Sequence, residues 1–479
     1  MNCSFNVLYD PWIPLMGTDG VCVERGILET LEHAHELRSI SDASPMVEYS
    51  TFRFLIVFLM DALRPDELED IEALLDVGHF DMDRVCAYVE QCISEGVSFD
   101  LFDDTRPFMQ TEVSARWDKE TKPVAALDYT VPSGNNHIHF DHLAKSESYS
   151  PAKSMRMLLS AQIFCTSAAQ GYPSNVNGAP PWFTLINGKN LFETLVLNMV
   201  SIDETRVKFD DPPVIWRNSE IVESKKDVAQ TSWLYGMLFP ARRIHLIPDE
   251  DGRVSSIYLS QGMNYVNPSN WFDPHVIYNV NEKGRFNCKP TTEFAIWQNL
   301  ASLISTRNEC APQVLSNYVR FHTGGVVDMT LYGVATNQAS YLQSSRSDLH
   351  LPVGIIGSET AEEFIRLYVS SAKSISKSVR LALAHREVPE NSRREAIADF
   401  NSTSENLLFE LLETLCGGAD IRSLLLESEE KLLSKAYSCT AEKLGELVLR
   451  GRTMLETAEL RLKELNKAAK AIRRKWENE

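Results

Sequence analysis

The stretch Gly333-Val-Ala-Thr-Asn-Gln-Ala-Ser340 follows a moderately apolar run, Gly324 to Tyr332, and the chain then resumes as Tyr341-Leu342. Gly333 has no Cβ, so it tolerates the positive φ of a sharp change of direction, and we expect a turn here. The turn presents Asn337 and Gln338 side by side, and their amides supply donors and acceptors suited to base edges or phosphates. The alternative is an ordinary surface turn, in which these amides cap local backbone.

Length and composition place the chain among soluble globular proteins. Its 479 residues suffice for two or three domains, and it is 44% hydrophobic and 24% charged. Lys and Arg number 47 against 66 Asp and Glu, which gives a net charge of −19. A protein that coats nucleic acid by itself usually has the opposite sign. Any contact with nucleic acid must therefore come from local basic positions or be shared with more basic partners.

The cysteines and the apolar runs predict a cytoplasmic protein. The nine cysteines include no C-x-x-C pair, which is typical of reduced thiols in a cytosol. The first residues do not resemble a signal peptide. The longest apolar run, Phe54 to Met60, is far too short to cross a membrane.

The hydrophobic pattern predicts an α+β fold. Apolar positions at helical spacing indicate a helix over residues 45–62, and Pro151 begins another that extends to about residue 169. Residues 243–248 and 253–259 have the pattern of two strands joined by a turn. A capping box at Thr360-Ala-Glu-Glu363 begins a helical region, with further helices expected at 392–415, at 421–437 and from 440 onward. We therefore expect a large mixed α/β domain over residues 1–355 and a C-terminal four-helix bundle over residues 356–479.

One stretch matches a catalytic pattern. His137-Ile-His139-Phe-Asp141-His142 has the H-x-H-x-D-H spacing of zinc ligands in metallo-β-lactamase-like hydrolases. Those ligands directly follow an apolar strand, whereas Pro-Ser-Gly-Asn-Asn precedes them here. The alternative to a zinc site is a polar loop with three accessible imidazoles.

Other catalytic signatures are missing from the sequence. It has no P-loop, G-x-G-x-x-G, G-x-S-x-G or H-E-x-x-H. Basic doublets, which are usually solvated surface, occur at Lys225-Lys226, Arg242-Arg243, Arg393-Arg394 and Arg473-Arg474-Lys475. Since the last two lie in the expected bundle, the bundle is the better candidate for a face that holds a phosphate backbone.

Five stretches, taken in order, resemble the large subunit of the type I-E CRISPR surveillance complex Cascade, the CasA family. They are Phe5–Pro14, Arg106–Gln110, Pro132–Asn136 with Phe140–His142, Gly171–Asn198, and Asn337–Ala339. Together with the terminal bundle they span essentially the whole chain. The family carries Phe-Asp-His without the two upstream histidines, so the resemblance argues against the zinc site.

The resemblance implies a non-catalytic role in DNA recognition, with no metal and no cofactor. The family reads the protospacer-adjacent motif of duplex DNA from the minor groove and starts strand separation. Gln338, flanked by Asn337 and Ala339, matches the family's glutamine wedge, and such an inserted side chain unstacks base steps. The family's glycine loop, whose backbone lies in the minor groove, corresponds to Gly171 and its neighbours Tyr172, Ser174 and Asn175.

The resemblance also implies partners. The loop with Asn135, Asn136 and Phe140 matches the element that docks on the guide RNA and adjacent subunits. The bundle would face DNA and the small subunits, and the body would help recruit the helicase–nuclease. The family's lysine finger has no lysine at its place, Gln261 to Asn264. A purely structural scaffold subunit, in which Gln338 has no DNA role, remains a further alternative.

Overall fold

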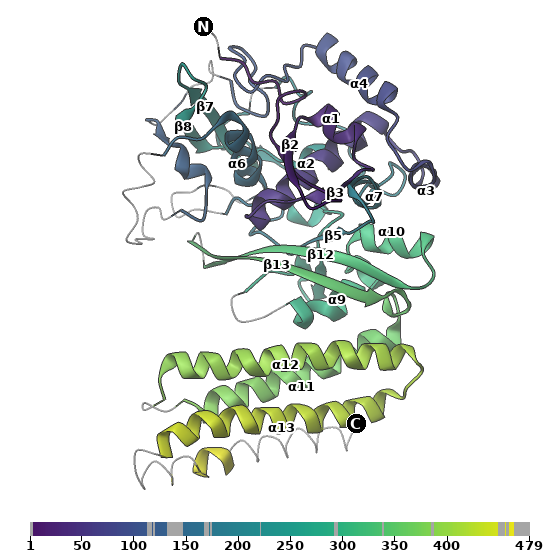
Figure 1. Ribbon diagram of the computed structural model, residues 1–479, viewed down its shortest axis with the longest axis vertical. Coiled ribbons are helices and arrows are strands. Elements are labelled where there is room, and N and C mark those ends of the chain that lie inside the picture. The colour runs from purple at the N-terminus through teal and green to yellow at the C-terminus, as the bar shows by residue number, and fades with distance from the viewer. Residues whose placement is uncertain are drawn as a thin grey trace. The chain divides into compact units, whose positions relative to one another are not determined.

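The chain forms two compact units (Figure 1). The computed structural model describes residues 3–112, 117, 120–131, 147–166, 172, 175–220, 222–291, 296–337, 340–384, 388–448, 456 and 459–463. Unit 1 comprises Met1–Ile296 and Asn308–Leu351, and unit 2 comprises Trp297–Arg307 and Pro352–Glu479. The sequence analysis assigns residues 297–307 to the first domain. They group with unit 2 because Trp297 packs edge-on against Tyr368, with ring centroids 6.4 Å apart.

Helix α2 (Pro45–Leu63) is the centre of unit 1. Every residue of α2 except Pro45 and Ala62 is buried, which confirms the predicted helix over residues 45–62. A helix that is buried on all sides must be covered on all sides, and α2 packs against four other helices and two strands. The other α-helices among the described residues of unit 1 are α1 (Ile27–Glu32), α3 (Leu68–Val77), α4 (Met82–Ser94), α6 (Pro151–Ile163), α7 (Leu191–Leu197), α8 (Trp233–Met237) and α10 (Gln313–Phe321).

Helix α6 is shorter than predicted. It begins at Pro151 as expected, but it ends at Ile163 rather than near residue 169. Asn175 explains the end, because its amide nitrogen donates to the carbonyls of Gln162 and Ile163 at 2.8 and 3.2 Å. Carbonyls in the last turn of a helix have no partner within it, and a residue distant in sequence supplies one here.

The strands of unit 1 form small sheets with the orders β2–β1–β3, β4–β8–β7, β13–β12–β5, β10–β11 and β6–β9. The two predicted strands are confirmed as β7 and β8, which pair antiparallel from Arg242↔Gln261 to Pro248↔Val254. The bounds are β1 (Ile13–Gly17), β2 (Cys22–Arg25), β3 (Leu37–Ile40), β4 (Lys122–Pro123), β5 (Phe183–Ile186), β6 (Asp227–Val228), β7 (Arg242–Pro248), β8 (Val254–Gln261), β9 (Asn264–Tyr265), β10 (Tyr278–Asn281), β11 (Gly284–Asn287), β12 (Val326–Asn337) and β13 (Ser340–Pro352).

The prediction of a turn at Gly333 is wrong. Strand β12 runs through Gly333 to Asn337, and its neighbour β13 begins at Ser340, so the change of direction lies between Asn337 and Ser340. Gly333 is needed for close packing: a Cβ there would lie 2.4 Å from Cγ of Pro290 and 2.7 Å from the ring of Trp182. Glycine within a strand often marks such a close approach.

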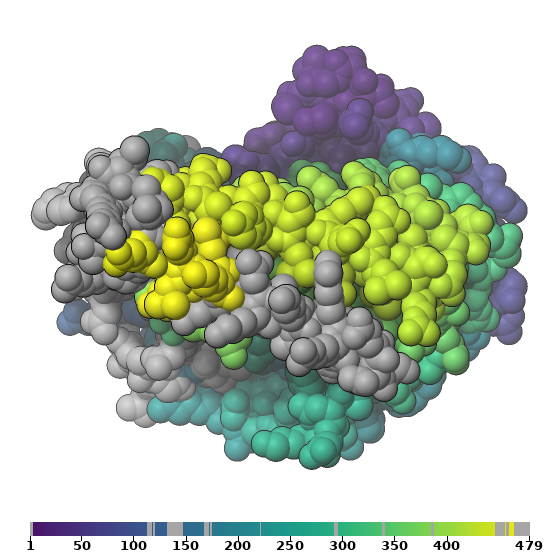
Figure 2. Space-filling view, turned by 90° about the horizontal axis from the view of Figure 1, so that it is seen from below, coloured from purple at the N-terminus to yellow at the C-terminus, as the bar shows by residue number. Residues whose placement is uncertain are grey.

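Unit 2 is helical. Its helices are α9 (Leu300–Ile304), α11 (Glu359–Ala382), α12 (Glu390–Cys416) and α13 (Ile421–Val448). Helices α12 and α13 pack against each other, and in the space-filling view the green to yellow atoms of this C-terminal part of the chain lie together (Figure 2). The α+β class is confirmed. Of the fourth helix predicted from residue 440 onward, residues 440–448 belong to α13, and of the residues beyond them the structure describes 456 and 459–463, which are helical.

Two predicted boundaries in unit 2 are wrong. The N-cap of α11 is Ser358, whose hydroxyl accepts from the Ala361 amide, and not the Thr360 box. Helix α13 continues to Val448 through the break expected before residue 440, and within it the Thr440 hydroxyl donates to the Ala436 carbonyl four residues earlier. None of the helices in the described residues is long and apolar enough to cross a membrane.

Candidate nucleic-acid interface

The hairpin β12–β13 presents its tip at Asn337 and Ser340. Asn337 is the last residue of β12 and is exposed. Gln338 and Ala339 lie outside the described residues, so their roles stay predictions. The arm behind the tip is supported from within, because Val334 and Ala335 are 3% and 2% exposed.

Strand β5 joins this hairpin to the loop that precedes it in sequence. It pairs antiparallel with β12, with Phe183 opposite Tyr332 and Ile186 opposite Met329. In this register the chain before Phe183 runs beside the chain after Tyr332. Trp182, the last residue of the loop, accordingly packs on Gly333. The loop that ends at Trp182 and the hairpin tip therefore extend from the same end of one sheet.

Two side chains anchor this loop to the body. Tyr172 is 7% exposed, and its ring lies between two cations, with Nζ of Lys122 at 5.4 Å and the guanidinium of Arg242 at 5.0 Å from its centroid. Asn175 is also 7% exposed, with its amide committed to the end of α6. The sequence analysis groups both with DNA-contacting residues, whereas their side chains are occupied in the protein interior. Gly171 and Ser174 lie outside the described residues.

A buried polar network holds the loop at a third point, Asn177. Its amide nitrogen donates to Oδ2 of Asp273 at 2.7 Å, and its amide oxygen accepts from the indole of Trp271 at 2.9 Å. Arg53 of α2 donates to both carboxylate oxygens of Asp273, at 3.1 and 2.6 Å. Burial acts to raise the pKa of Asp273, but the charge and hydrogen bonds of Arg53 hold this pKa below its usual value. The loop is thus fixed to the central helix through an ion pair.

His275 completes this network as a neutral group. Burial lowers its pKa to about 4. Its Nε2 lies 3.0 Å from the carbonyl of Asn198 and its Nδ1 lies 3.1 Å from the hydroxyl of Tyr49. A neutral imidazole that donates from Nε2 and accepts at Nδ1 satisfies both contacts, so this histidine has a structural role at neutral pH.

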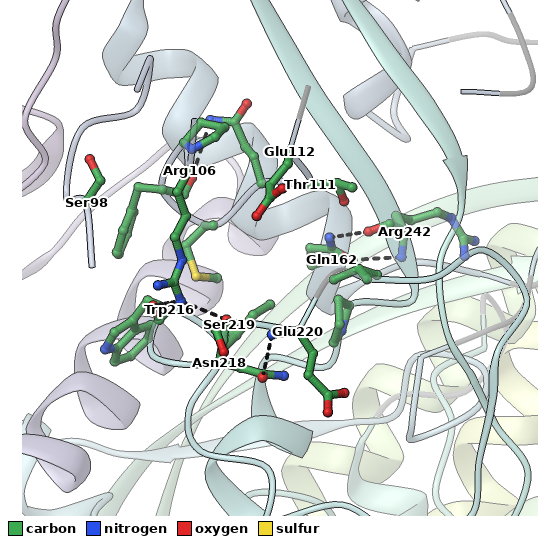
Figure 3. Close-up of a pocket in the computed structure, with 17 residues that line it drawn as sticks. Ser98, Arg106, Thr111, Glu112, Gln162, Trp216, Asn218, Ser219, Glu220 and Arg242 are labelled. Atoms are coloured by element: carbon green, nitrogen blue, oxygen red, sulfur yellow. Dashed lines mark hydrogen bonds between the residues drawn. The ribbon is translucent and has the colours of Figure 1, made fainter. Parts of the chain in front are cut away.

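A small polar cavity lies behind the loop anchors, with a volume of about 50 Å³. Gln162 and Arg242 exchange two hydrogen bonds at its wall, at 2.7 and 3.1 Å, and Arg106 donates to the carbonyls of Trp216 and Asn218 at 3.0 and 2.8 Å (Figure 3). These side chains tie neighbouring segments together. The described residues contain no group of three or more His, Cys, Asp or Glu that could hold a metal ion.

Lys225 lies beside the segment in which the resemblance leads us to seek a lysine. Its backbone N–H donates to the Gly262 carbonyl at 3.0 Å, and the Asn264 N–H donates to the Lys226 carbonyl at 2.9 Å. Lys225 is exposed and has a left-handed φ of 63°. The sequence analysis treats this doublet as ordinary surface, because only the fold brings it next to residues 261–264.

The other positions predicted to bind nucleic acid or zinc add little to the described interface. Arg393 and Arg394 both pair with Glu390, at 3.1 and 3.3 Å, which offsets their charge. Residues 473–475 lie outside the described residues. So do Asn135, Asn136 and Phe140 of the guide-docking loop, and His137, His139, Asp141 and His142 of the possible zinc site.

The sequence matches a known family over most of its length. The pattern of the family described as CRISPR-associated protein Cse1 (CRISPR_cse1) matches residues 6–450. The chain belongs to the Cse1 family. The resemblance to the Cascade large subunit is thereby confirmed. This Cse1-family chain is 27% identical over 398 residues to the CRISPR-associated protein CasA/Cse1 of Thermus thermophilus, and the match covers 79% of this chain and 76% of that protein.

Solved structures share the fold. CasA from Thermus thermophilus superposes with a TM-score of 0.77 at 20% identity, covering 98% of this chain and 100% of that chain. Cse1 from Acidimicrobium ferrooxidans superposes with a TM-score of 0.76 at 18% identity, and the match covers 98% of this chain and 99% of that chain. A chain of a CRISPR RNA-guided surveillance complex superposes with a TM-score of 0.74 at 18% identity, and the match covers 96% of this chain and 99% of that chain. At these identities the likeness concerns the fold alone.

Proposed function

We propose that this chain recognises the protospacer-adjacent motif of duplex DNA from the minor groove, within a type I-E Cascade complex. It then starts strand separation and helps recruit the effector helicase–nuclease, and it catalyses no reaction itself. The observation that carries the proposal is the β5–β12 register, since it directs the loop before Trp182 and the tip of the β12–β13 hairpin to the same end of one sheet. A motif reader that also opens the duplex needs both elements at one place.

The two elements divide the work. The loop, anchored through Tyr172, Asn175 and Asn177, offers backbone to the minor groove, where the pattern of donors and acceptors is degenerate. We therefore expect several related motifs to be accepted. The tip inserts Gln338, flanked by Asn337, between base steps, and the unstacking costs a few kcal/mol that new contacts offset.

The acidic charge of the chain fits this division. With a net charge of −19, most of the DNA backbone and the guide RNA must be held by the backbone and small subunits of the complex. Guide–target pairing supplies sequence specificity beyond the motif. The guide-docking residues Asn135, Asn136 and Phe140 would hold this chain to the guide RNA and the adjacent subunits.

Replacing Asn337 and Gln338 together by alanine should slow motif-dependent opening of a target duplex about tenfold, which corresponds to about 1.4 kcal/mol. The rate is measured in the reconstituted guide complex with a fluorescent base analogue next to the motif. Asn281→Ala is a matched control, because Asn281 is likewise an exposed last residue of the first strand of a hairpin. Normal opening by the double variant would favour the scaffold role.

Replacing Lys225 by alanine should weaken DNA binding about equally on all targets and reduce the salt slope by about one, as expected for one lost phosphate contact. Lys226→Ala is the control, because Lys226 already pairs with Glu223 at 3.0 Å and Glu220 at 3.8 Å. Titrations from low to moderate salt measure both slopes. A changed motif preference with an unchanged slope would contradict a phosphate contact at Lys225.

A further inference from the structure

A buried carboxylate of the central helix binds both arms of the β12–β13 hairpin. Glu48 of α2 is 2% exposed. Its Oε1 accepts from the hydroxyl of Tyr332, in β12, at 2.5 Å and lies 3.2 Å from Nη1 of Arg346, in β13. Burying a carboxylate is costly unless it is paired and hydrogen-bonded. Glu48 meets that condition chiefly through the two arms, with one long contact of 3.5 Å from the Asp42 N–H to its Oε2.

A second set of contacts aligns the arms with each other. The Thr330 hydroxyl donates to Oδ1 of Asp348 at 2.7 Å and receives the side-chain amide of Asn187, just beyond β5, at 3.0 Å. Asp348 in turn lies 3.4 Å from Nε of Arg346. These contacts reach across β5, β12 and β13. Because a slip of one residue would turn every side chain to the opposite face, the contacts fix the register of the hairpin.

The hairpin projects well beyond this clamp of Glu48, Tyr332 and Arg346. Asn337 is five residues past Tyr332, and Ser340 is six residues before Arg346, so at about 3.3 Å per residue the tip lies about 15–20 Å away. A two-stranded ribbon is only marginally stable alone. A tip that separates stacked bases experiences an opposing force, and the clamp adds to the packing of Val334 and Ala335 in keeping the tip from being displaced.

We propose that the Glu48–Tyr332–Arg346 clamp is the positioning device of strand opening: it sets the reach and rigidity of the hairpin tip without touching DNA. The inference rests on the proposed function of the tip. Without the clamp, the complex still binds an open target, but the tip yields when it meets a closed duplex. The clamp residues therefore determine the opening step and not the affinity for opened DNA.

The alternative is that the clamp only stabilises the fold. Arg346 helps to separate the two roles, because its side chain is 45% exposed at the edge of the sheet, so its loss opens no cavity, and the Tyr332 hydroxyl still hydrogen-bonds Glu48. A folding defect would lower the thermal midpoint and would weaken binding to every form of the target. A positioning defect would slow the opening of closed duplex alone.

The test compares Arg346→Gln and Tyr332→Phe with Arg346→Lys in the full guide complex. Each is assayed for opening of a closed target and for binding to a target that carries a pre-opened bubble beside the motif. We expect the first two variants to slow opening about five- to tenfold, the loss expected for one hydrogen bond of ordinary net strength. Binding to the bubble target should stay within about twofold, and Arg346→Lys should retain most of the opening rate.

Arg320→Gln is the matched control, since Arg320 is a 51% exposed arginine that pairs with Glu204 outside the hairpin. Equal losses on closed and bubble targets would overturn the inference in favour of fold stability. Normal opening by Arg346→Gln, while the Asn337/Gln338 double variant is slow, would overturn the clamp and leave the proposed function intact. Normal opening by both would overturn the proposed function, and the clamp with it.

Discussion

Replacing Asp273 by alanine is expected to lower the free energy of unfolding by about 3–5 kcal/mol, because it leaves the buried Arg53 cation without its partner. Asp273 is 1% exposed and receives two hydrogen bonds from Arg53 and one from Asn177. Denaturant unfolding of the chain, followed by tryptophan fluorescence, measures the change. We also expect the loop held by Asn177 to lose its anchor, so motif recognition should fail at temperatures at which the variant is still folded.

Glu147→Ala is the control for Asp273→Ala. Glu147 pairs with Lys153 at 2.9 Å, but both side chains are about two-fifths exposed, at 42% and 39%. Exposed ion pairs contribute at most about 1 kcal/mol, so the unfolding midpoint should hardly change. Equal, small effects at both positions would show that Arg53 finds another partner, and would contradict the anchoring of the loop through the ion pair.

Replacing Gly333 by alanine is expected to destabilise the chain by about 1–3 kcal/mol, the usual cost of overpacking a filled core. The new Cβ would lie 2.4 Å from Pro290 and 2.7 Å from the indole of Trp182. Trp182 is 3% exposed, so its indole is enclosed by other side chains. If Trp182 or β12 shifts instead, the loop and the hairpin tip are displaced together, so duplex opening should fall more than stability alone explains.

Gly324→Ala isolates the effect of that contact. Gly324 lies shortly before β12, its φ is outside the left-handed region, and a Cβ there would meet nothing within 4 Å. Alanine restricts the unfolded chain more than glycine, so this variant should be neutral or more stable by up to about 1 kcal/mol. Thermal unfolding of the two variants in parallel gives the comparison. If Gly333→Ala is as stable as Gly324→Ala, the coupling of the loop and the hairpin through Trp182 is contradicted.

Local patterns predicted those parts of the fold that depend on near neighbours. Helix α2 and strands β7 and β8 follow from hydrophobic spacing within one segment. The sequence predicts a turn at Gly333, whereas β12 runs through this residue, and the reason for a glycine there is a different one. That reason lies in Trp182 and Pro290, which are distant in sequence.

The remaining features of the interface depend on contacts that no local pattern contains. In the sequence, Glu48 is an ordinary helical glutamate. In the structure it is buried, with Tyr332 and Arg346 as its partners. In the sequence, Lys225 is an ordinary surface lysine. The fold places it beside residues 261–264, because its N–H donates to the Gly262 carbonyl. The resemblance places Asn175 in the loop that enters the minor groove, yet its amide caps α6. The family resemblance, built on ordered motifs, supplied the functional hypothesis that these contacts now refine.

The most direct test of the account is duplex-DNA binding by the guide complex, reconstituted with and without this chain, on targets that carry or lack candidate adjacent motifs. The account predicts that motif-dependent binding and opening require the chain, return when it is added back, and weaken when Asn337 and Gln338 are both replaced by alanine. Equal binding to all targets, whether or not the chain is present, would contradict a role in motif recognition.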